Sequence, residues 1–317
     1  MNQLTGALNL EKNFNSITHN LPMEPETVCF KSVTNLDIHA DVYRTKTTRC
    51  NAPAIVYIHG GCLMYGSRKM IKLEQVERYL KWGYTLISLD YRLAPETKLP
   101  FIIEDLQDAF RWIQQHGTGL FNVDPERLAV VGHSAGGYLA LMSGFCVKPV
   151  PKAIVSFYGY GDIIGDWYSK PDPFYCSLPA VSEAASGIHK TGSEITEPYA
   201  GRGKDQLYLY YRQHGLWARE VGGHDPHSEA SFFKPYCPVQ NVTRSFPPTL
   251  LLHGDHDTDV PYQQSVQMAE ALSRAGVENQ LITIENGPHG FDGHFDDLQV
   301  QSAFAAIESF LRRHLGE

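Results

Sequence analysis

An apolar run at residues 128–131 leads directly into Gly-His-Ser-Ala-Gly at residues 132–136, and a helix-like run follows over 138–145. A strand that passes through Gly-x-Ser-x-Gly into a helix is typical of the nucleophile elbow. Both glycines are needed because a side chain at either position would collide with neighbouring backbone. We therefore expect Ser134 at the tip of a sharp turn, where the helix N-terminus could stabilise an oxyanion. A Gly/Ser-rich turn without chemistry is the alternative, and the rest of the chain must decide between them.

Short apolar runs alternate with longer helical patterns along the chain. The expected strands are 54–58, 84–89, 128–131, 153–157, 249–252 and 280–284, after an antiparallel hairpin over 26–44. The expected helices are 69–82, 103–116, 138–146, 262–274 and 296–314. Continuous apolar strands separated by helices predict an α/β fold, in which helices cover both faces of a mostly parallel sheet. Functional groups of such folds lie beyond the carboxyl ends of the strands.

A chain of 317 residues with 43% hydrophobic residues is long enough for one α/β domain, residues 1–317, that carries an insertion. Residues 160–240 break the alternation, because they are rich in Gly, Pro, Tyr, Trp and His and contain short helical pieces such as 205–214. An irregular connection of that length is improbable inside a compact domain. We interpret it as an inserted cap over the site. An insertion without a functional role is the alternative.

Composition excludes several classes of function. The net charge of −8 and the pI near 5.9 argue against nucleic acid as a partner. The six cysteines are scattered, so we expect neither zinc nor disulfides, and no cofactor or metal. Residues 1–20 lack the apolar core of a signal peptide, and no apolar run is long enough for a membrane span. These features predict a cytoplasmic protein that acts on a small molecule. Assembly into a homo-oligomer is possible and is left open by the sequence.

A nucleophilic serine needs a base and an orienting carboxylate, and both follow in the sequence. An acid-rich turn at 253–261 comes after the strand expected at 249–252, and its candidates are Asp255, Asp257 and Asp259. His289 follows the strand expected at 280–284, within Gly-Pro-His-Gly-Phe, and His294 is its nearest rival. The order Ser, Asp, His differs from both common serine-protease orders.

Backbone donors for an oxyanion are expected in the loop after the strand 54–58, where His-Gly-Gly-Cys occupies residues 59–62. The N–H groups of Gly60, Gly61 and Ala135 could converge on a carbonyl oxygen. Glycine suits this loop because the backbone itself approaches the substrate. We expect His59 to shape the loop by hydrogen bonding to backbone rather than to act as a base.

Five ordered motifs together resemble the hormone-sensitive-lipase-like branch of the α/β-hydrolases. They are His-Gly-Gly at 59–61, Asp-Tyr-Arg-Leu-Ala-Pro-Glu at 90–96, Gly-His-Ser-Ala-Gly-Gly at 132–137, His-Gly-x-x-Asp-x-x-Val-Pro at 253–261 and His-Gly-Phe at 289–291. The resemblance covers roughly residues 50–160 and 245–315. It implies an α/β-hydrolase fold with about eight strands, a cofactor-free serine hydrolase mechanism and carboxylic esters as substrates. Within the motif at 253–261, the aspartate position that the resemblance implies for the acid is Asp257.

Two residues depart from the family pattern. Cys62 stands where the family often has a third glycine, and His133 stands where it often has an aspartate. Both variants resemble prolyl-oligopeptidase-like, feruloyl-esterase-like and kynurenine-formamidase-like hydrolases. Hydrolysis of an amide, formamide or peptide is therefore an alternative, and a catalytically silent binding protein of this fold is another.

Several aromatic side chains could line a substrate pocket or belong to the core. They are Tyr65, Tyr158, Trp167, Tyr175 and Phe291. His133 could likewise line the pocket or pack beneath the turn. We expect Cys62 to serve packing or pocket lining, since no base accompanies it in sequence. Arg92 is expected to pair with Glu104 or Asp105 and to hold its loop.

Overall fold

A computed structural model describes residues 24–44, 51–188, 192–197 and 204–316, and these residues build around one eight-stranded sheet. The strands are β1 (Glu26–Val33), β2 (Leu36–Tyr43), β3 (Ala52–Ile58), β4 (Thr85–Leu89), β5 (Val123–His133), β6 (Ala153–Phe157), β7 (Thr249–Gly254) and β8 (Asn279–Ile284). Every expected strand is present. The sheet thereby confirms the mostly parallel α/β-hydrolase architecture.

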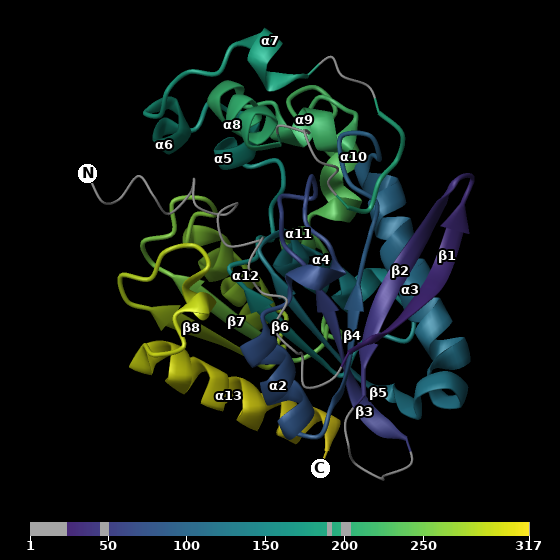
Figure 1. Ribbon diagram of the computed structural model, residues 1–317. Coiled ribbons are helices and arrows are strands. Elements are labelled where there is room, and N and C mark those ends of the chain that lie inside the picture. Colours follow the sequence, from purple (N-terminus) through teal and green to yellow (C-terminus); the bar gives the residue numbers. More distant parts are fainter. Residues whose placement is uncertain (1–23, 45–50, 189–191, 198–203, 317) are drawn as a thin grey trace.

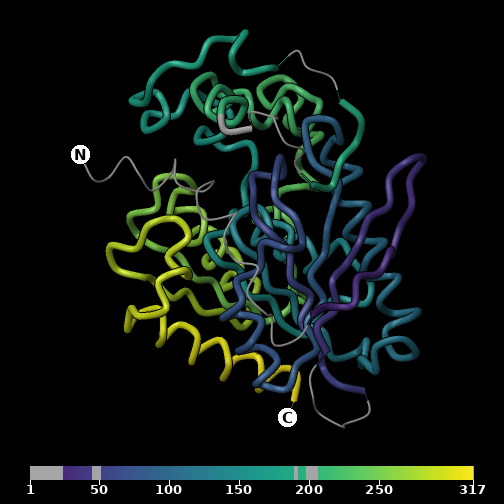
Figure 2. Tube along the Cα trace, in the orientation of Figure 1, coloured from purple at the N-terminus to yellow at the C-terminus, as the bar shows by residue number. Residues whose placement is uncertain are grey.

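The spatial order of the strands is β1-β2-β4-β3-β5-β6-β7-β8. β2 pairs antiparallel with both β1 and β4, whereas the other neighbouring pairs are parallel. The predicted hairpin is confirmed, with Glu26 opposite Val42. In Figure 2 this purple hairpin occupies one edge of the sheet, and the yellow C-terminal elements lie at the other edge.

Helices cover both faces of the sheet, which explains why the central strands are apolar on both sides. One core joins β3 residues Ala54 and Val56 to α3 (Leu99–Phe121), α4 (Ala135–Cys146) and α12 (Gln263–Arg274). The other joins Ile55 and Tyr57 to α2 (Leu73–Lys81) and α13 (Leu298–Leu315). Alternate residues of one strand therefore serve different cores.

Helix boundaries differ from the expectations by more than two residues at three places. The helix expected at 69–82 is a short 3₁₀ turn, η1 (Arg68–Met70), followed by α2, because Ile71 and Lys72 have extended backbone. The helix expected at 103–116 is longer, since Pro100 is tolerated in its first turn and Asn122 ends it in the left-handed conformation. α4 begins immediately after Ser134, three residues before the expected start.

The connection between β6 and β7 is largely helical. It contains α5 (Asp166–Ser169), α6 (Pro173–Cys176), α7 (Glu183–Ser186), α8 (Lys204–His214), α9 (Trp217–Gly222), α10 (Ala230–Phe233), η2 (Lys234–Tyr236) and α11 (Pro238–Asn241). Figure 1 shows α5–α9 grouped above the sheet. They reach the carboxyl ends of strands, because Trp217 donates to the carbonyl of Cys62 after β3 and Arg212 contacts Asp259 after β7.

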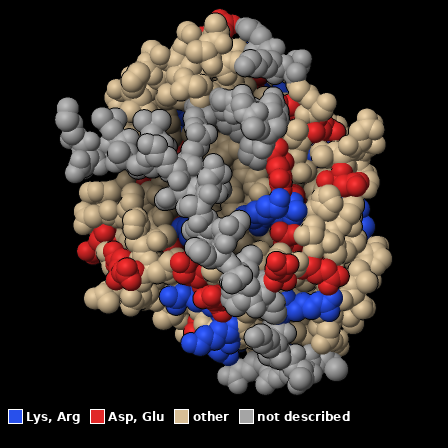
Figure 3. All heavy atoms as spheres, in the orientation of Figure 1, with Lys and Arg blue, Asp and Glu red and all other residues tan. Residues whose placement is uncertain are grey.

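None of the described helices is long and apolar enough to cross a membrane. The signal-peptide prediction concerned residues 1–20, which lie outside the described residues. On the face shown in Figure 3, acidic and basic side chains lie interspersed below the helical connection.

Candidate active site

Ser134 occupies the turn between β5 and α4 in a backbone conformation that few non-glycine residues adopt, with φ 55° and ψ −117°. Its N–H donates to the carbonyl of Phe157 at 2.9 Å, and its carbonyl accepts from the N–H of Tyr138 at 2.9 Å. These bonds hold the turn between two neighbouring elements. Strain of this kind persists only where the surrounding structure fixes it, and it concentrates at functional sites.

The two glycines of the turn have no space for a side chain. A Cβ on Gly132 would lie 1.9 Å from the carbonyl oxygen of Gly136, and a Cβ on Gly136 would lie 2.0 Å from that of Ile58. The strand, the turn and the first turn of α4 are therefore in direct backbone contact. This contact gives the physical reason for the Gly-x-Ser-x-Gly spacing.

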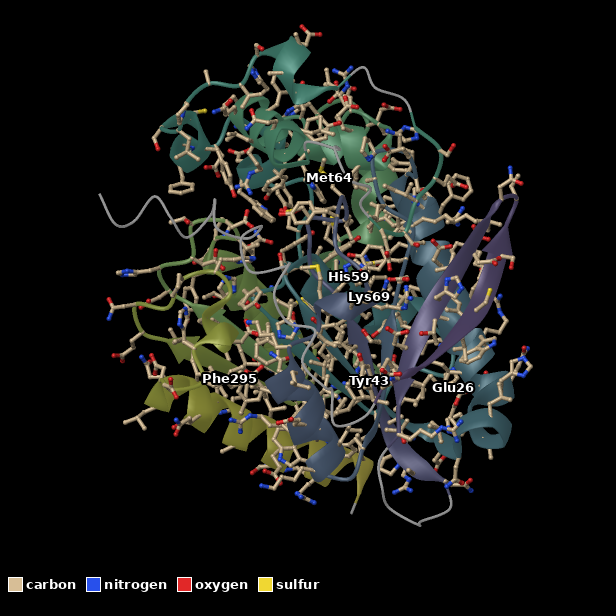
Figure 4. The ribbon with its side chains drawn as sticks, viewed as in Figure 1. Glu26, Tyr43, His59, Met64, Lys69 and Phe295 are labelled. Atoms are coloured by element: carbon tan, nitrogen blue, oxygen red, sulfur yellow. The ribbon has the colours of Figure 1, made fainter. Side chains whose placement is uncertain are left out.

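The loop after β3 lies against Ser134. A Cβ on Gly60 would lie 3.3 Å from Cβ of Ser134 and 2.9 Å from the carbonyl oxygen of His133. Gly61 has a φ of 110°, which favours glycine. Figure 4 shows His59 at the foot of this loop and Met64 farther toward the helices. Nδ1 of His59 lies 2.7 Å from the carbonyl oxygen of Gly60, so the expectation that His59 shapes the loop is confirmed.

Asp257 and His289 meet as an ion pair. Oδ2 of Asp257 lies 2.7 Å from Nδ1 of His289, and Oδ1 accepts from the N–H groups of Asp259 and Val260 at 2.8 and 2.9 Å. Nε2 of the buried His253 lies 3.2 Å from Oδ2. The carboxylate is therefore fixed from both sides.

Burial alone would raise the pKa of the Asp257 carboxyl, but His289 and His253 outweigh it and hold this pKa well below its usual range. Burial alone would lower the pKa of His289, but the Asp257 carboxylate outweighs it and raises this pKa to about 9. An imidazole whose pKa is raised in this way is a stronger base than a free imidazole.

None of the sequence alternatives for acid and base takes part in the contact at Nδ1 of His289. Asp255 is exposed and accepts from the N–H of Asn286 at 2.6 Å, which is a turn-forming role. Asp259 lies 3.6 Å from Nε2 of His289 and makes no contact with Nδ1 that would orient the ring. His294 is exposed. Asp257 and His289 are thus the pair that the geometry brings together.

A family model described as the alpha/beta hydrolase fold matches residues 55–293, which run from β3 through the histidine loop. The chain belongs to this alpha/beta hydrolase family. The matched range contains the serine turn, the glycine loop and the Asp257–His289 pair.

Curated relatives of this alpha/beta hydrolase are much longer proteins. The chain is 30% identical over 300 residues to the non-reducing polyketide synthase Preu6 of Preussia isomera, covering 84% of this chain and 14% of that protein. It is 29% identical over 346 residues to the non-reducing polyketide synthase ausA of Emericella nidulans, covering 93% of this chain and 14% of that protein. The chain spans about a seventh of the length of these relatives.

Solved structures share the fold. An alpha/beta hydrolase superfamily protein from Enterococcus faecalis superposes with a TM-score of 0.71 at 24% identity, over 91% of this chain and 98% of that chain. A thermophilic esterase from Thermogutta terrifontis superposes with a TM-score of 0.65 at 23% identity, over 93% of each chain. At these identities the likeness establishes the architecture alone.

A second buried carboxylate, Asp292, lies near the site of this alpha/beta hydrolase and was not predicted. It accepts hydrogen bonds from Lys72 at 2.8 Å, from Gln75 at 2.7 Å and from the hydroxyl of Tyr158. Its Oδ2 lies 3.4 Å from Nε2 of His133. Burial alone would raise the pKa of Asp292, but His133 and Lys72 lower it. Its partners come from α2 and from the ends of β5 and β6, so sequence spacing gave no signal for it.

The aromatic candidates divide into two groups. The His133 ring stacks on Phe157 with centroids 4.3 Å apart, and Phe291 packs on Phe157 and Tyr158 inside the core of α2 and α13. These contacts favour the packing interpretation for His133 and Phe291. The centroid of the Tyr158 ring also lies 4.5 Å from that of the His289 ring, so the two rings pack together.

The second aromatic group surrounds Arg212 on the helices between β6 and β7. Its guanidinium lies 4.3 Å from the ring centre of Tyr175 and 5.6 Å from that of Trp167. Tyr65 makes an edge contact with Tyr208, which also lies against the guanidinium. Tyr65, Trp167 and Tyr175 therefore belong to one aromatic wall on the side of the acid turn.

Cys62 and Arg92 take structural positions. Burial raises the pKa of the Cys62 thiol to about 12, so it stays neutral rather than nucleophilic. The guanidinium of Arg92 binds the Asp105 carboxylate at 2.7 and 2.8 Å, which confirms the expected pairing. Glu104 lies farther away, at 3.7 Å.

Within the part of the chain that the structure describes, one group of three side chains could hold a metal ion. It consists of Cys29, Asp37 and His39 on the β1–β2 hairpin, where two of the three are exposed. This group shares no residue with the Ser134, Asp257 and His289 site.

Proposed function

We propose that this chain is a serine hydrolase that cleaves carboxylic esters through an acyl-enzyme intermediate. The observation that carries the proposal is the 2.7 Å contact between Oδ2 of Asp257 and Nδ1 of His289, in a chain whose Ser134 occupies a strained turn against a glycine loop. A turn without a catalytic role would need neither the ion pair of the buried Asp257 carboxylate with His289 nor the close approach of Gly60.

In the proposed first step, Ser134 Oγ attacks the ester carbonyl while Nε2 of His289 takes its proton. Asp257 holds the ring and stabilises the imidazolium that forms. The N–H groups of Gly60, Gly61 and Ala135 bind the oxyanion. Each donor lowers the activation free energy by about 2.7–4 kcal/mol. His289 then protonates the leaving alcohol, and water releases the acyl group by the same route. No step requires a metal or a cofactor.

The segment 160–240 is proposed as the cap that sets specificity. Its helices supply Trp217 and Arg212, which bind the glycine loop and the acid turn respectively. A segment bonded to both sides of the site is well placed to select the substrate.

Acyl thioesters form a second candidate substrate class, because the relatives at 29–30% identity are named non-reducing polyketide synthases. A thioester carbonyl is attacked by the same serine, so the site residues stay unchanged. Amides and formamides remain alternatives on chemical grounds. A panel of para-nitrophenyl esters, N-acetylcysteamine thioesters, aryl formamides and aminoacyl amides separates these classes by relative kcat/KM.

A fluorophosphonate probe tests the proposal directly. Wild-type protein should be labelled at Ser134, and Ser134→Ala should abolish both labelling and ester turnover while it keeps the wild-type circular dichroism spectrum. His289→Ala should lose turnover as well, whereas the matched change His294→Ala should not. Absence of labelling, or turnover retained by Ser134→Ala, would instead favour a binding protein of this fold.

A further inference from the structure

Two aspartates of one turn contact opposite nitrogens of His289. Asp257 lies at Nδ1, 2.7 Å away, and Asp259 lies at Nε2, with Oδ2 3.6 Å away. Nε2 is the nitrogen that exchanges a proton with serine and leaving group in a Ser-His-Asp site. Asp259 therefore faces the place where a substrate reacts, whereas Asp257 lies behind the ring.

The other oxygen of Asp259 is held by three donors. Oδ1 accepts from the hydroxyls of Tyr175 and Tyr208 at 2.7 and 2.6 Å, and from Nη1 of Arg212 at 2.9 Å. Its backbone N–H is bound by Asp257 at 2.8 Å. These contacts hold Oδ1 in place, while Oδ2 lies 3.6 Å from Nε2 of His289.

The charges around Asp259 favour a donor or a cation as its partner. The buried Arg212 lies between two carboxylates, Asp172 at 2.8 Å and Asp259 at 2.9 Å, so the three groups carry one net negative charge. The side chain of Asp259 is 18% exposed, and its surroundings are aromatic. A hydroxyl or ammonium is stabilised at Oδ2, whereas an ether oxygen or a carboxylate is disfavoured.

On the basis of the proposed ester hydrolysis, we propose that Asp259 is a specificity-determining residue that selects substrates with a hydrogen-bond donor, a hydroxyl or an ammonium, next to the ester group. The donor binds Oδ2 while the ester carbonyl lies at Ser134. Tyr175, Tyr208 and Arg212 are positioning residues that keep Oδ2 in place.

The test compares esters that differ only in this donor. The acyl arm uses para-nitrophenyl phenylacetate, mandelate, O-methylmandelate and phenylglycinate. The alcohol arm uses the 2-hydroxyethyl and 2-methoxyethyl esters of phenylacetic acid. In at least one arm, wild-type kcat/KM should favour the donor over its methyl ether by about tenfold or more, the range expected for a hydrogen bond to a charged group.

The variant Asp259→Asn should reduce this preference to about threefold or less, because an amide N–H replaces the accepting oxygen. The matched change Asp255→Asn, on the same turn, should keep the wild-type ratio. Tyr208→Phe, which removes one donor to Oδ1, should give an intermediate ratio and provides the test if Asp259→Asn does not fold. Effects on His289 alter all esters alike and therefore cancel in the ratio.

Equal kcat/KM for donors and methyl ethers in both arms of the wild type overturns the inference, and so does a ratio that survives in Asp259→Asn or Tyr208→Phe. If the phenylacetate ester is still turned over and Ser134 is still labelled in those experiments, the proposed function stands and only the role of Asp259 fails. If Ser134 is not labelled, both fail.

Discussion

The carboxylate of Asp292 lies 3.4 Å from Nε2 of His133, which joins the loop that follows His289 to the residue that precedes Ser134. Lys72, which precedes α2, and Gln75 in α2 bind the same carboxylate, and Tyr158 binds it from the end of β6. Ser134 follows β5 and His289 follows β8, so this buried carboxylate connects the segments that carry the proposed nucleophile and the proposed base. We infer that Asp292 acts as a positioning residue.

Asp292→Asn should lower kcat while it leaves KM nearly unchanged, because the loop of His289 loses its charged anchor. We expect a loss of about 1–3 kcal/mol in the free energy of unfolding, the cost of weakening a buried hydrogen-bonded charge. Urea unfolding and steady-state kinetics on one ester measure both effects. Asp296→Asn, an exposed aspartate nearby, is the control. Equal behaviour of the two variants would contradict the role of Asp292.

The candidate residues Ser134, Asp257 and His289 could be proposed from sequence because each has a local signature. Ser134 lies in a backbone turn that only Gly-x-Ser-x-Gly permits, and Asp257 and His289 each follow a buried strand. Asp292 and Arg212 carry no such signature. Their partners come from elements distant in sequence, as with Lys72 and Asp292, so only the folded chain brings them together.

The pH dependence of turnover should reflect the pair of His289 and Asp257. A general base must be neutral in the free enzyme. Since the pKa of His289 is raised to about 9, kcat/KM should rise about tenfold per pH unit below that value and level off above it. A pH profile from 6 to 10 in one buffer system at constant ionic strength measures this limb.

Asp257→Asn should move the same limb to lower pH, because the neighbouring negative charge that stabilises the imidazolium is gone. It should also lower kcat by about 10⁴, since the ring is no longer held in the required tautomer. Asp255→Asn, on the same turn, should keep the wild-type limb. A wild-type limb centred near pH 6.5 would show that Asp257 does not raise the pKa of His289.

The fold was predicted best where periodicity and length agree. Strands β3, β6 and β7 are short and apolar on both faces, so their ends were found within two residues. The start of α4 was misplaced because Gly136 and Gly137, in its first turn, are weak helix formers. Backbone contacts of the turn, rather than propensity, begin that helix at Ala135.

Gly60→Ala should impair the site more than the fold. Its Cβ would lie 2.9 Å from the carbonyl oxygen of His133 and 3.3 Å from Cβ of Ser134, so the nucleophile turn must shift. We expect kcat to fall by about 100-fold or more, with a loss of about 1–3 kcal/mol in unfolding free energy. Kinetics and urea unfolding test both.

The matched control is Gly119→Ala in α3, where a Cβ would meet nothing within 4 Å. That change should leave kcat unaltered and stabilise the protein by about 0.5–1 kcal/mol, because alanine favours a helix interior. Equal losses of activity in the two variants would show that the effect of Gly60→Ala does not arise from its contact with the Ser134 turn.

Arg212 should hold the helices between β6 and β7 on the sheet. Its fully buried guanidinium binds Asp172, which caps α6, and Asp259 in the acid turn. Arg212→Met leaves two carboxylates without their cation, and the expected loss in unfolding free energy is about 3–5 kcal/mol. Arg212→Lys should recover only part of this unfolding free energy, because an ammonium lacks the planar fork that reaches both partners.

The control Arg219→Met, at an exposed arginine on α9, should change the free energy of unfolding by less than about 0.5 kcal/mol. Limited proteolysis should then cut Arg212→Met first within 160–240; equal cleavage of both variants would mean that these helices are anchored by other contacts.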